Sequence, residues 1–568
     1  MPLVLRDSPP LSDTTSTDDE SCFVMCKPAT TLKSISTIAR KARDLGRIHK
    51  VPCITCIARV SERQGNHVGI QLCKNCLMSL RLADRRQSSR NGQAARKLLQ
   101  NQGPGLDSLP KPQIQLWSTN QKEQHAVQFF VQHSAPELSG YFDSAFWERM
   151  VLQAGRHEPA VRHVLAAIGS LHEKLLIGAV YPDETKDERT TFALEQCNSA
   201  IRYLTKPTKS GSSPDPRLVL TTCVLFACFE ALQGHCEQGS MHATQGITLF
   251  RQFASAHGGA VWDNHTFAIE LDQMSAIMKR MDMQSKALMG NRLRSTFDAK
   301  PMLPDKLPIP TAFSSLGEAR AGLEVGMSTL ANFLAYLGAE AAEHRFYDVV
   351  VANAEKHLVL RPWLDEWERV FSEFLDKHSA SLSARDRKGA MVLKAYHIVA
   401  EIVCDIDLSL GEMAWDSCHD KFAAVLDLAT AILEGSKQAD VSVIEARWKS
   451  SGVFISAPSA TLSFSLDIVD PLYQVCACCR DPVLRRKALD LLARYPRQDV
   501  MWSSWSAWKL GKFIMRVEEE SAPITPVRAA DIPIDSRIAQ AWFDFSNKSS
   551  VQSARGLVAY LKAVPQSG

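Results

Sequence analysis

The sequence predicts an all-α protein: a large helical body preceded by a small, partly disordered module of cysteines and basic residues. From Gln121 onward, apolar residues recur with a period of about 3.6, which places them on one face of a helix. No run of alternating apolar and polar residues indicates a sheet, and no repeat of about 33 to 47 residues indicates a solenoid. At 568 residues the chain is too long for one compact core, so two or three domains are expected.

The composition is that of a globular protein, with 45% hydrophobic and 22% charged residues. Residues 1–30 contain two adjacent prolines and an acidic run, not the charged start and apolar block of a secretory signal. We therefore expect a reducing compartment, in which the fifteen cysteines are thiols or metal ligands. The longest apolar run, Leu218–Phe229, is well short of the ~20 residues that cross a bilayer, so no membrane segment is expected.

Composition shifts divide the chain into four parts. Residues 1–50 form a disordered and basic N-terminal segment, and residues 51–90 form the cysteine module. Residues 91–120 are a linker with repeated Gly and Pro, and residues 121–568 form the helical body. Four prolines between 298 and 310 exclude a helix there and place an ordered loop or a seam at 298–312.

Two cysteine pairs lie in the second part. Cys53 and Cys56 form one C-x2-C pair, Cys73 and Cys76 form another, and sixteen residues separate the pairs. Two such pairs complete a tetrahedral shell of four thiolates, and the spacing matches known zinc sites. The alternative from the residues alone is a decayed, empty site.

Positive charge surrounds these cysteines. Residues 31–100 carry fifteen Lys and Arg against three acidic residues, a formal charge of +12, whereas the whole chain carries only +3. A module that binds the phosphates of double-stranded DNA requires such a charge. The candidate phosphate contacts are Arg59, Arg63, Lys74, Arg81, Arg85 and Arg86. The alternative is solvated surface charge. The clusters at 84–100 are also typical of a nuclear-import signal or a solvated tether.

Capping residues and prolines locate several helices of the body. Asp143 stands where an N-cap would begin a helix carrying Phe146 and Trp147, and Pro159 stands in the first turn of the following helix. Pro216–Leu232 is hydrophobic nearly all round, which predicts full burial. The other predicted helices are Glu123–Val131, Gly239–Phe253, Phe267–Met281, Leu316–Ala339, Phe346–His357, Trp363–His378, Ala384–Cys404, Asp420–Ile432, Val483–Leu492 and Val500–Glu519.

Some aromatic and cysteine residues of the body have structural interpretations. Trp502, Trp505 and Trp508 recur every third residue, which favours core packing or a partner groove over base stacking. Most later cysteines occupy apolar helical patterns and read as small core residues: Cys197, Cys223, Cys228 and Cys404. The run Cys476, Cys478 and Cys479 has no second ligand pair nearby and does not predict a metal site.

Catalytic motifs do not emerge from the sequence. His157-Glu158 has its next histidine at His163, so it does not form the H-E-x-x-H arrangement of a zinc hydrolase. The sequence contains no G-x-S-x-G elbow, no G-x-G-x-x-G turn after a strand and no Walker loop. We therefore do not expect an enzyme.

Several separated stretches resemble the helical regulatory region of fungal zinc binuclear-cluster (Zn2Cys6) transcription factors. They are PELSGYFDSAFWERMVLQAGRHEPAVRHVLAAIGSLHE (136–173), VLFACFEALQGH (224–235), FSSLGEA (313–319), YPRQDVMWSSW (495–505), IMRVEEE (514–520) and IPIDSRI (532–538). The resemblance covers roughly residues 120–545. It implies a nuclear regulator with an N-terminal DNA-binding zinc cluster and a C-terminal helical regulatory domain.

The cysteine module departs from the family pattern, in which six thiolates share two zinc ions. Cys53, Cys56, Cys73 and Cys76 match the first, second, fourth and fifth cysteines. Arg63 occupies the third position, and the sixth is missing from 83–85. One zinc ion is therefore the most that the module holds, unless Cys22, Cys26 or His67 contributes. A degenerate cluster and a mis-joined reading frame both account for this pattern.

The sequence thus favours a sequence-specific DNA-binding regulator of RNA polymerase II genes, of a metabolic pathway or gene cluster. Its expected partners are double-stranded DNA, the transcription machinery or co-regulators, and a second copy of the chain as a homodimer. One alternative is a regulator that has lost direct DNA contact and acts through protein partners. Another is a helical ligand-binding protein with an effector pocket between body helices.

Overall fold

The structure, a computed structural model, describes most of the chain from residue 120 to residue 541. The described ranges are 120–177, 187–205, 215–256, 307–342, 354–436, 461–499 and 501–541, with residue 438 and most of 273–284; a few positions within 501–541 are left out. The predictions for residues 1–119 lie outside these ranges. Within them the predicted all-α fold is confirmed, because helices dominate and the strands are three short ones.

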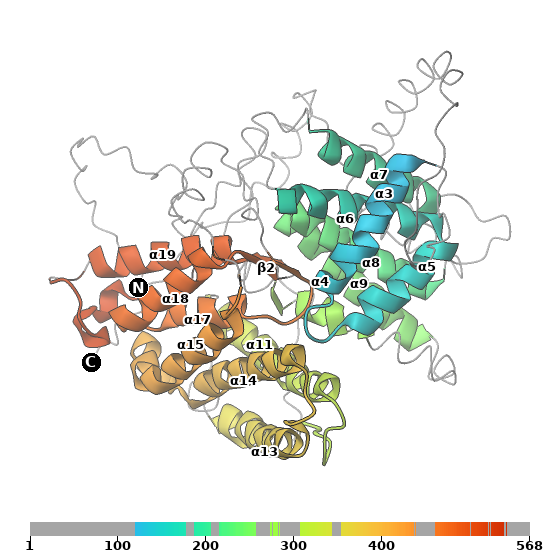
Figure 1. The fold of residues 1–568 in the computed structure, drawn as a ribbon. Coiled ribbons are helices and arrows are strands. Elements are labelled where there is room, and N and C mark those ends of the chain that lie inside the picture. Colours follow the sequence, from blue (N-terminus) through green and yellow to red (C-terminus); the bar gives the residue numbers. More distant parts are fainter. Residues whose placement is uncertain are drawn as a thin grey trace, which may run out of the picture.

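The first group of helices packs around α6. It comprises α3 (Gln121–Phe129), α4 (Ala135–Leu138), α5 (Val151–His157), α6 (Pro159–Ile177), α7 (Glu188–Leu204), α8 (Pro216–Leu232) and α9 (Cys236–Ala256), drawn cyan to green in Figure 1. Helix α6 contacts α3, α5, α7 and α8, and α8 packs on α9. Gly169 permits the close approach of α3, since a Cβ there would lie 2.2 Å from the Ala126 carbonyl oxygen. Helix α8 is buried nearly all round, as predicted.

The second group centres on α14 (Ala384–Asp405). A capping box between Ser383 and Asp386 starts this helix. It contacts α11 (Leu316–Ala342), α13 (Arg361–His378) and α15 (His419–Leu433), and the 3-10 segment Leu408–Cys418 connects it to α15. Helix α13 turns one aromatic face inward, and Trp367 donates from Nε1 to the Ala319 carbonyl oxygen at 2.9 Å.

The third group contains α17 (Val469–Cys478), α18 (Pro482–Arg494) and α19 (Ser504–Glu520) with a three-stranded sheet. Strand β1 (Thr461–Ser463) pairs in parallel with β2 (Arg497–Asp499), and β2 pairs antiparallel with β3 (Trp502–Ser503). Helix α17 was not predicted. The strands were not predicted either, because strands of two or three residues carry no periodic signal. Trp502 therefore lies in strand β3 and not in the predicted helix. Its side chain is fully buried beside Tyr473.

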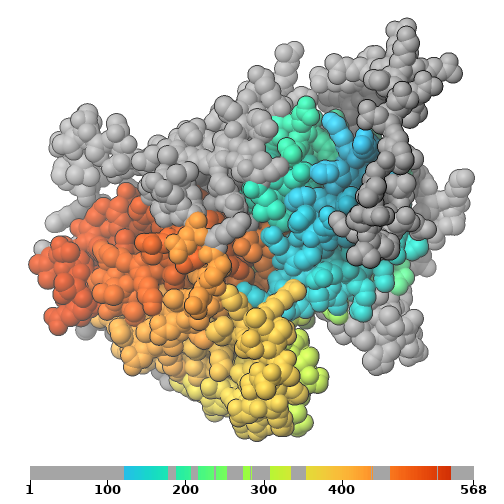
Figure 2. All heavy atoms as spheres, in the orientation of Figure 1, coloured from blue at the N-terminus to red at the C-terminus, as the bar shows by residue number. Residues whose placement is uncertain are grey.

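Sheet and helices join the three groups into one core. The Phe464 amide donates to the Leu138 carbonyl oxygen at 3.0 Å, so the chain just after β1 binds α4 across the molecule. Phe464 also packs edge-on against the buried Trp147. In the space-filling view, the N-terminal helices (cyan) abut both the middle helices (yellow) and the C-terminal ones (orange) (Figure 2).

The segment after α19 is held by buried charges. Arg480 is fully buried and donates to Glu518 at 3.0 Å and to the Ile538 carbonyl oxygen at 3.0 Å. Arg537 is fully buried as well and pairs with Asp416 at 2.8 Å. Since a buried guanidinium is stable only when paired, these bonds fix the segment against the 3-10 turn at 408–418. None of the helices in the described part of the chain combines the length and apolarity needed to traverse a bilayer.

The predicted role of Asp143 as an N-cap is wrong in its chemistry. The backbone carbonyl of Asp143 does accept from the amides of Phe146 and Trp147. Its carboxylate, however, binds Arg280 at 2.6 Å and Arg320 at 2.5 Å instead of capping the helix. Two guanidinium groups from distant segments bind the carboxylate instead of the local amides, because both partners of these buried bonds are charged and neutralise one another.

Candidate ligand pocket

The predicted metal and DNA contacts lie outside the described residues. These positions are Cys53, Cys56, Cys73 and Cys76 for zinc and Arg59, Arg63, Lys74, Arg81, Arg85 and Arg86 for DNA. They stay predictions. The predicted effector pocket between body helices falls within the described part, and there the structure contains a cavity.

The cavity measures about 140 Å³ and lies between α11, α14, α17 and the 273–284 segment. An apolar protein cavity of about 150 Å³ accommodates benzene, so this one has room for a single ring or a short branched chain. Its lining consists of Arg280, Met283, Gln284, Met327, Leu330, Ala331, Tyr396, Val399, Ala400, Val403, Leu466, Asp470 and Gln474. Met283, Met327 and Ala331 are only partly buried, which indicates that the cavity reaches the surface.

Helical spacing places these residues on the cavity wall. Tyr396, Val399, Ala400 and Val403 are separated by three, four and seven positions and so share one face of α14. Asp470 and Gln474 stand four positions apart on α17 for the same reason. The apolar wall therefore comes mainly from α11 and α14, and the polar wall from α17, the 273–284 segment and Tyr396.

Arg280 on the polar wall is already neutralised. Its two terminal nitrogens bind Asp143 at 2.6 Å and Glu324 at 2.7 Å, and Arg320 shares both acids. Burial alone would raise the pKa of Asp143, but Arg280 and Arg320 outweigh it and hold that pKa below the usual value. Two cations and two anions balance, so this cluster adds no net charge to the cavity.

Asp470 is the uncompensated charge of the cavity. Among the described residues, no cation and no hydrogen-bond donor contacts its carboxyl group, and burial raises its pKa from 3.8 to about 6. Asp470 also lies in the first turn of α17, where the helix dipole favours an anion. At pH 7 the group is therefore still mostly ionised. Burial and then Asp470 raise the pKa of Tyr396, whose hydroxyl stays protonated.

Removing the carboxylate of Asp470 should stabilise the fold. The rise from 3.8 to about 6 corresponds to at most about 3 kcal/mol of destabilisation above pH 7, and solvent screening of the partly buried Asp470 and the helix dipole each reduce it. Because the folded pKa exceeds the unfolded one, this cost is present above pH 6 and disappears as pH falls toward 4. At pH 7.5 the free energy of unfolding of the Asp470→Asn variant should therefore exceed that of wild type by about 1–2 kcal/mol. At pH 5 the difference should be roughly half as large.

Urea unfolding followed by circular dichroism at both pH values measures this difference. The charge of Asp470 also raises the pKa of Tyr396, Tyr473 and Asp499, so the measured difference includes the relief of these interactions. Asp467, Arg497 and Arg280 are common to both proteins. Asp427→Asn, which removes an exposed carboxylate on α15, is the control and should leave stability nearly unchanged. A variant less stable than wild type at both pH values would show that Asp470 has a stabilising partner.

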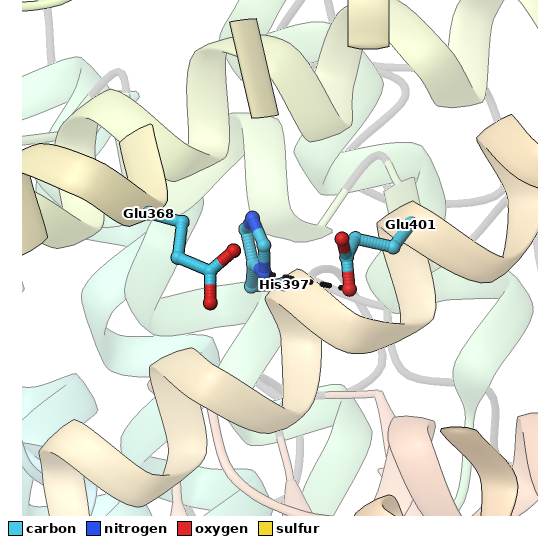
Figure 3. A group of neighbouring side chains, drawn as sticks. All are labelled: Glu368, His397 and Glu401. Atoms are coloured by element: carbon cyan, nitrogen blue, oxygen red, sulfur yellow. Dashed lines mark ion pairs between the residues drawn. The ribbon is translucent and has the colours of Figure 1, made fainter. Parts of the chain in front are cut away.

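A second group, Glu368, His397 and Glu401, brings together three potential metal ligands (Figure 3). Their donor atoms lie within 4.8 Å of one another. The His397 ring is buried and stacks on Trp367, with ring centroids 5.1 Å apart. Its Nε2 lies 3.1 Å from the Leu364 carbonyl oxygen and must be the protonated nitrogen, because a carbonyl only accepts. Nδ1 then faces Glu401 at 4.0 Å.

Glu401 already has cationic partners. Arg361 pairs with it at 3.0 Å, and Lys421 lies 3.6 Å from it. Both cations also bind Asp405. Burial lowers the pKa of His397 more than the neighbouring carboxylates raise it, so the imidazole is neutral near pH 7. We therefore interpret Glu401 as part of an ion-pair network with Arg361, Lys421 and Asp405 that joins α13, α14 and α15, with neutral His397 packed beside it.

The structure confirms the core roles predicted for several cysteines and tryptophans. Cys197, Cys223, Cys228 and Cys404 are buried. Trp505 and Trp508 stack on one another in α19 with centroids 4.4 Å apart, and both are largely buried. Burial raises the pKa of the Cys478 thiol to about 12, so it stays protonated and unreactive at neutral pH.

The chain is similar to a named transcription regulator over most of its length. The chain is similar to the aspercryptin biosynthesis cluster-specific transcription regulator atnN of Emericella nidulans. The two are 22% identical over 523 residues, covering 80% of this chain and 81% of the relative. No family model matches the chain, and no solved structure does. The chain is thus a distant homologue of a fungal gene-cluster-specific transcription regulator.

Proposed function

We propose that this protein is a sequence-specific DNA-binding regulator of RNA polymerase II genes, acting on a metabolic gene cluster in the nucleus. The observation that carries the proposal is the similarity to a cluster-specific transcription regulator along four fifths of the chain. It extends over the helical body, so it does not rest on the cysteine module alone.

The cysteine module supplies the DNA contact in this proposal. Its donor set of four thiolates in two C-x2-C pairs suits one tetrahedral zinc ion and is two ligands short of a binuclear cluster. Zinc supplies the fold of a segment too small to build its own core. The residues that then contact phosphates are Arg59, Arg63, Lys74, Arg81, Arg85 and Arg86. Each neutralised phosphate steepens the fall of log K with log salt concentration by about 0.9.

The helical body serves regulation. It offers co-regulators or the transcription machinery a large rigid surface, and a homodimer would present two DNA-binding modules to one site. The candidate ligand pocket lies in this body, about 190 residues along the chain from the cysteine module.

The test is a DNA-binding titration of the full chain. A random duplex pool is first selected for binding, and the enriched duplex is then titrated with and without a zinc chelator. We expect a specific shift in zinc-replete protein, at least a hundredfold loss with chelator, and about one zinc ion per chain by elemental analysis. Failure to enrich any sequence from the pool would reject direct DNA recognition.

Two other functions make different predictions in the same experiment. A regulator that acts only through protein partners would show no specific shift under either condition. A helical ligand-binding protein is favoured by the pocket and would likewise ignore DNA, but it would gain stability from a small molecule by mass action.

A further inference from the structure

We propose that the pocket between α11, α14, α17 and the 273–284 segment binds a compact apolar amine, whose ammonium group pairs with Asp470. The binding follows from the pocket itself. Its role as a signal to the regulator rests on the proposed function.

The size and walls of the cavity select the apolar part of the ligand. A volume of about 140 Å³ accommodates one ring or a short branched chain. Met327, Leu330 and Val403 belong to the apolar wall, and methionine side chains adapt to irregular shapes. Burial of the ligand's carbon atoms contributes roughly 25 cal/mol per Å², enough for weak binding of a small ring.

The charge of the cavity selects the amine. Arg280 is the one arginine of the lining, and its charge is balanced by Asp143 and Glu324. Asp470 has no such counter-ion among the described residues, and Tyr396 lines the same cavity. An ammonium group would therefore gain a charge-assisted bond, whereas a carboxylate ligand would be repelled.

Occupation of this site would fasten segments far apart in the sequence. The lining residues run from Arg280 to Gln474 and belong to the 273–284 segment and to the second and third helical groups. The first group joins them through Asp143, which binds Arg280. A ligand bound here stabilises the arrangement in which these segments meet, and it shifts the body toward that arrangement by its differential affinity.

Calorimetric titration of the full chain at pH 7.5 tests the proposal with three probes of one size: benzylamine, benzyl alcohol and benzoate. We expect saturable binding of benzylamine, at least tenfold weaker binding of benzyl alcohol, and no binding of benzoate. Asp470→Asn should weaken benzylamine binding at least tenfold, because a hydrogen bond to a charged group is worth about 1.5–3 kcal/mol. The exposed Asp427→Asn, which removes the same charge on α15, should bind like wild type.

A second variant covers the case in which Asp470→Asn alters the fold. Ala331→Leu fills the cavity from a partly exposed position on α11 and should block benzylamine while Asp470 is kept. The proposal is overturned if benzylamine does not bind at 10 mM (about 2.7 kcal/mol of binding free energy). It is also overturned if benzoate binds as tightly, or if neither pocket variant weakens benzylamine. Binding of benzylamine without a DNA shift would keep the pocket and reject direct DNA recognition. A DNA shift without benzylamine binding would keep DNA recognition and reject the pocket.

Discussion

Replacing Cys53 or Cys73 with alanine should abolish specific DNA binding while leaving the helical body folded. Each substitution removes one of four thiolates from the proposed zinc shell, and three remaining ligands hold the ion much less tightly. Without metal the segment around 51–82 has no core to keep its arginines in place. We expect at least a hundredfold loss of affinity for the selected duplex in an anisotropy titration.

The control for this prediction is Cys22→Ala, which changes a cysteine outside the two pairs. It should bind DNA like wild type, and all three proteins should give the same helical circular dichroism and unfolding midpoint. DNA affinity retained in both Cys53→Ala and Cys73→Ala would remove zinc from the recognition mechanism. Loss of affinity in Cys22→Ala would instead add a fifth candidate ligand.

Asp143→Ala should destabilise the body by about 3–5 kcal/mol, the cost of leaving buried charges unpaired. Asp143 is 6% exposed and binds Arg280 and Arg320, which are 2% and 7% exposed. Without it Glu324 alone faces two buried guanidinium groups. These bonds span 137 and 177 residues of sequence, so their loss loosens the first helical group from the second.

The matched control is Asp365→Ala, an exposed aspartate that pairs with Arg361 at 2.6 Å. Exposed pairs contribute about 0–1 kcal/mol, so this variant should unfold close to wild type. Urea midpoints by circular dichroism compare the two variants. A loss of less than about 1.5 kcal/mol in the free energy of unfolding of Asp143→Ala would show that water reaches the two arginines and solvates their charges.

Helix positions were largely predictable, because each helix carries its own periodic and capping signals. Pro159 and Pro216 stand in the first turns of α6 and α8, and Ala384 begins α14, as their local sequence predicts. Asp143 was misassigned for an instructive reason. An aspartate before an apolar helix is a good N-cap. Nothing in the local sequence indicates that its carboxylate binds two arginines far along the chain.

The pocket could not have been located in the same way. Met327, Tyr396 and Asp470 come from three helices, and none of them departs from an ordinary helical pattern in its own segment. Only one weak signal was present: an aspartate at the start of α17 amid apolar residues. Its meaning depends on which side chains from α11 and α14 face it.

The sequence by itself determined the helical body, the bounds of most of its helices, the burial of α8 and the basic cysteine module expected to bind zinc and DNA. These features depend on residues close together in the chain, whose spacing directly sets the local backbone and the local charge. Tertiary structure alone decided the pairing of Asp143 with Arg280 and Arg320, the strand that holds Trp502, and the cavity around Asp470. Each of these arises where segments distant in the chain meet, and the energy of a buried charge depends on neighbours that only the folded chain supplies.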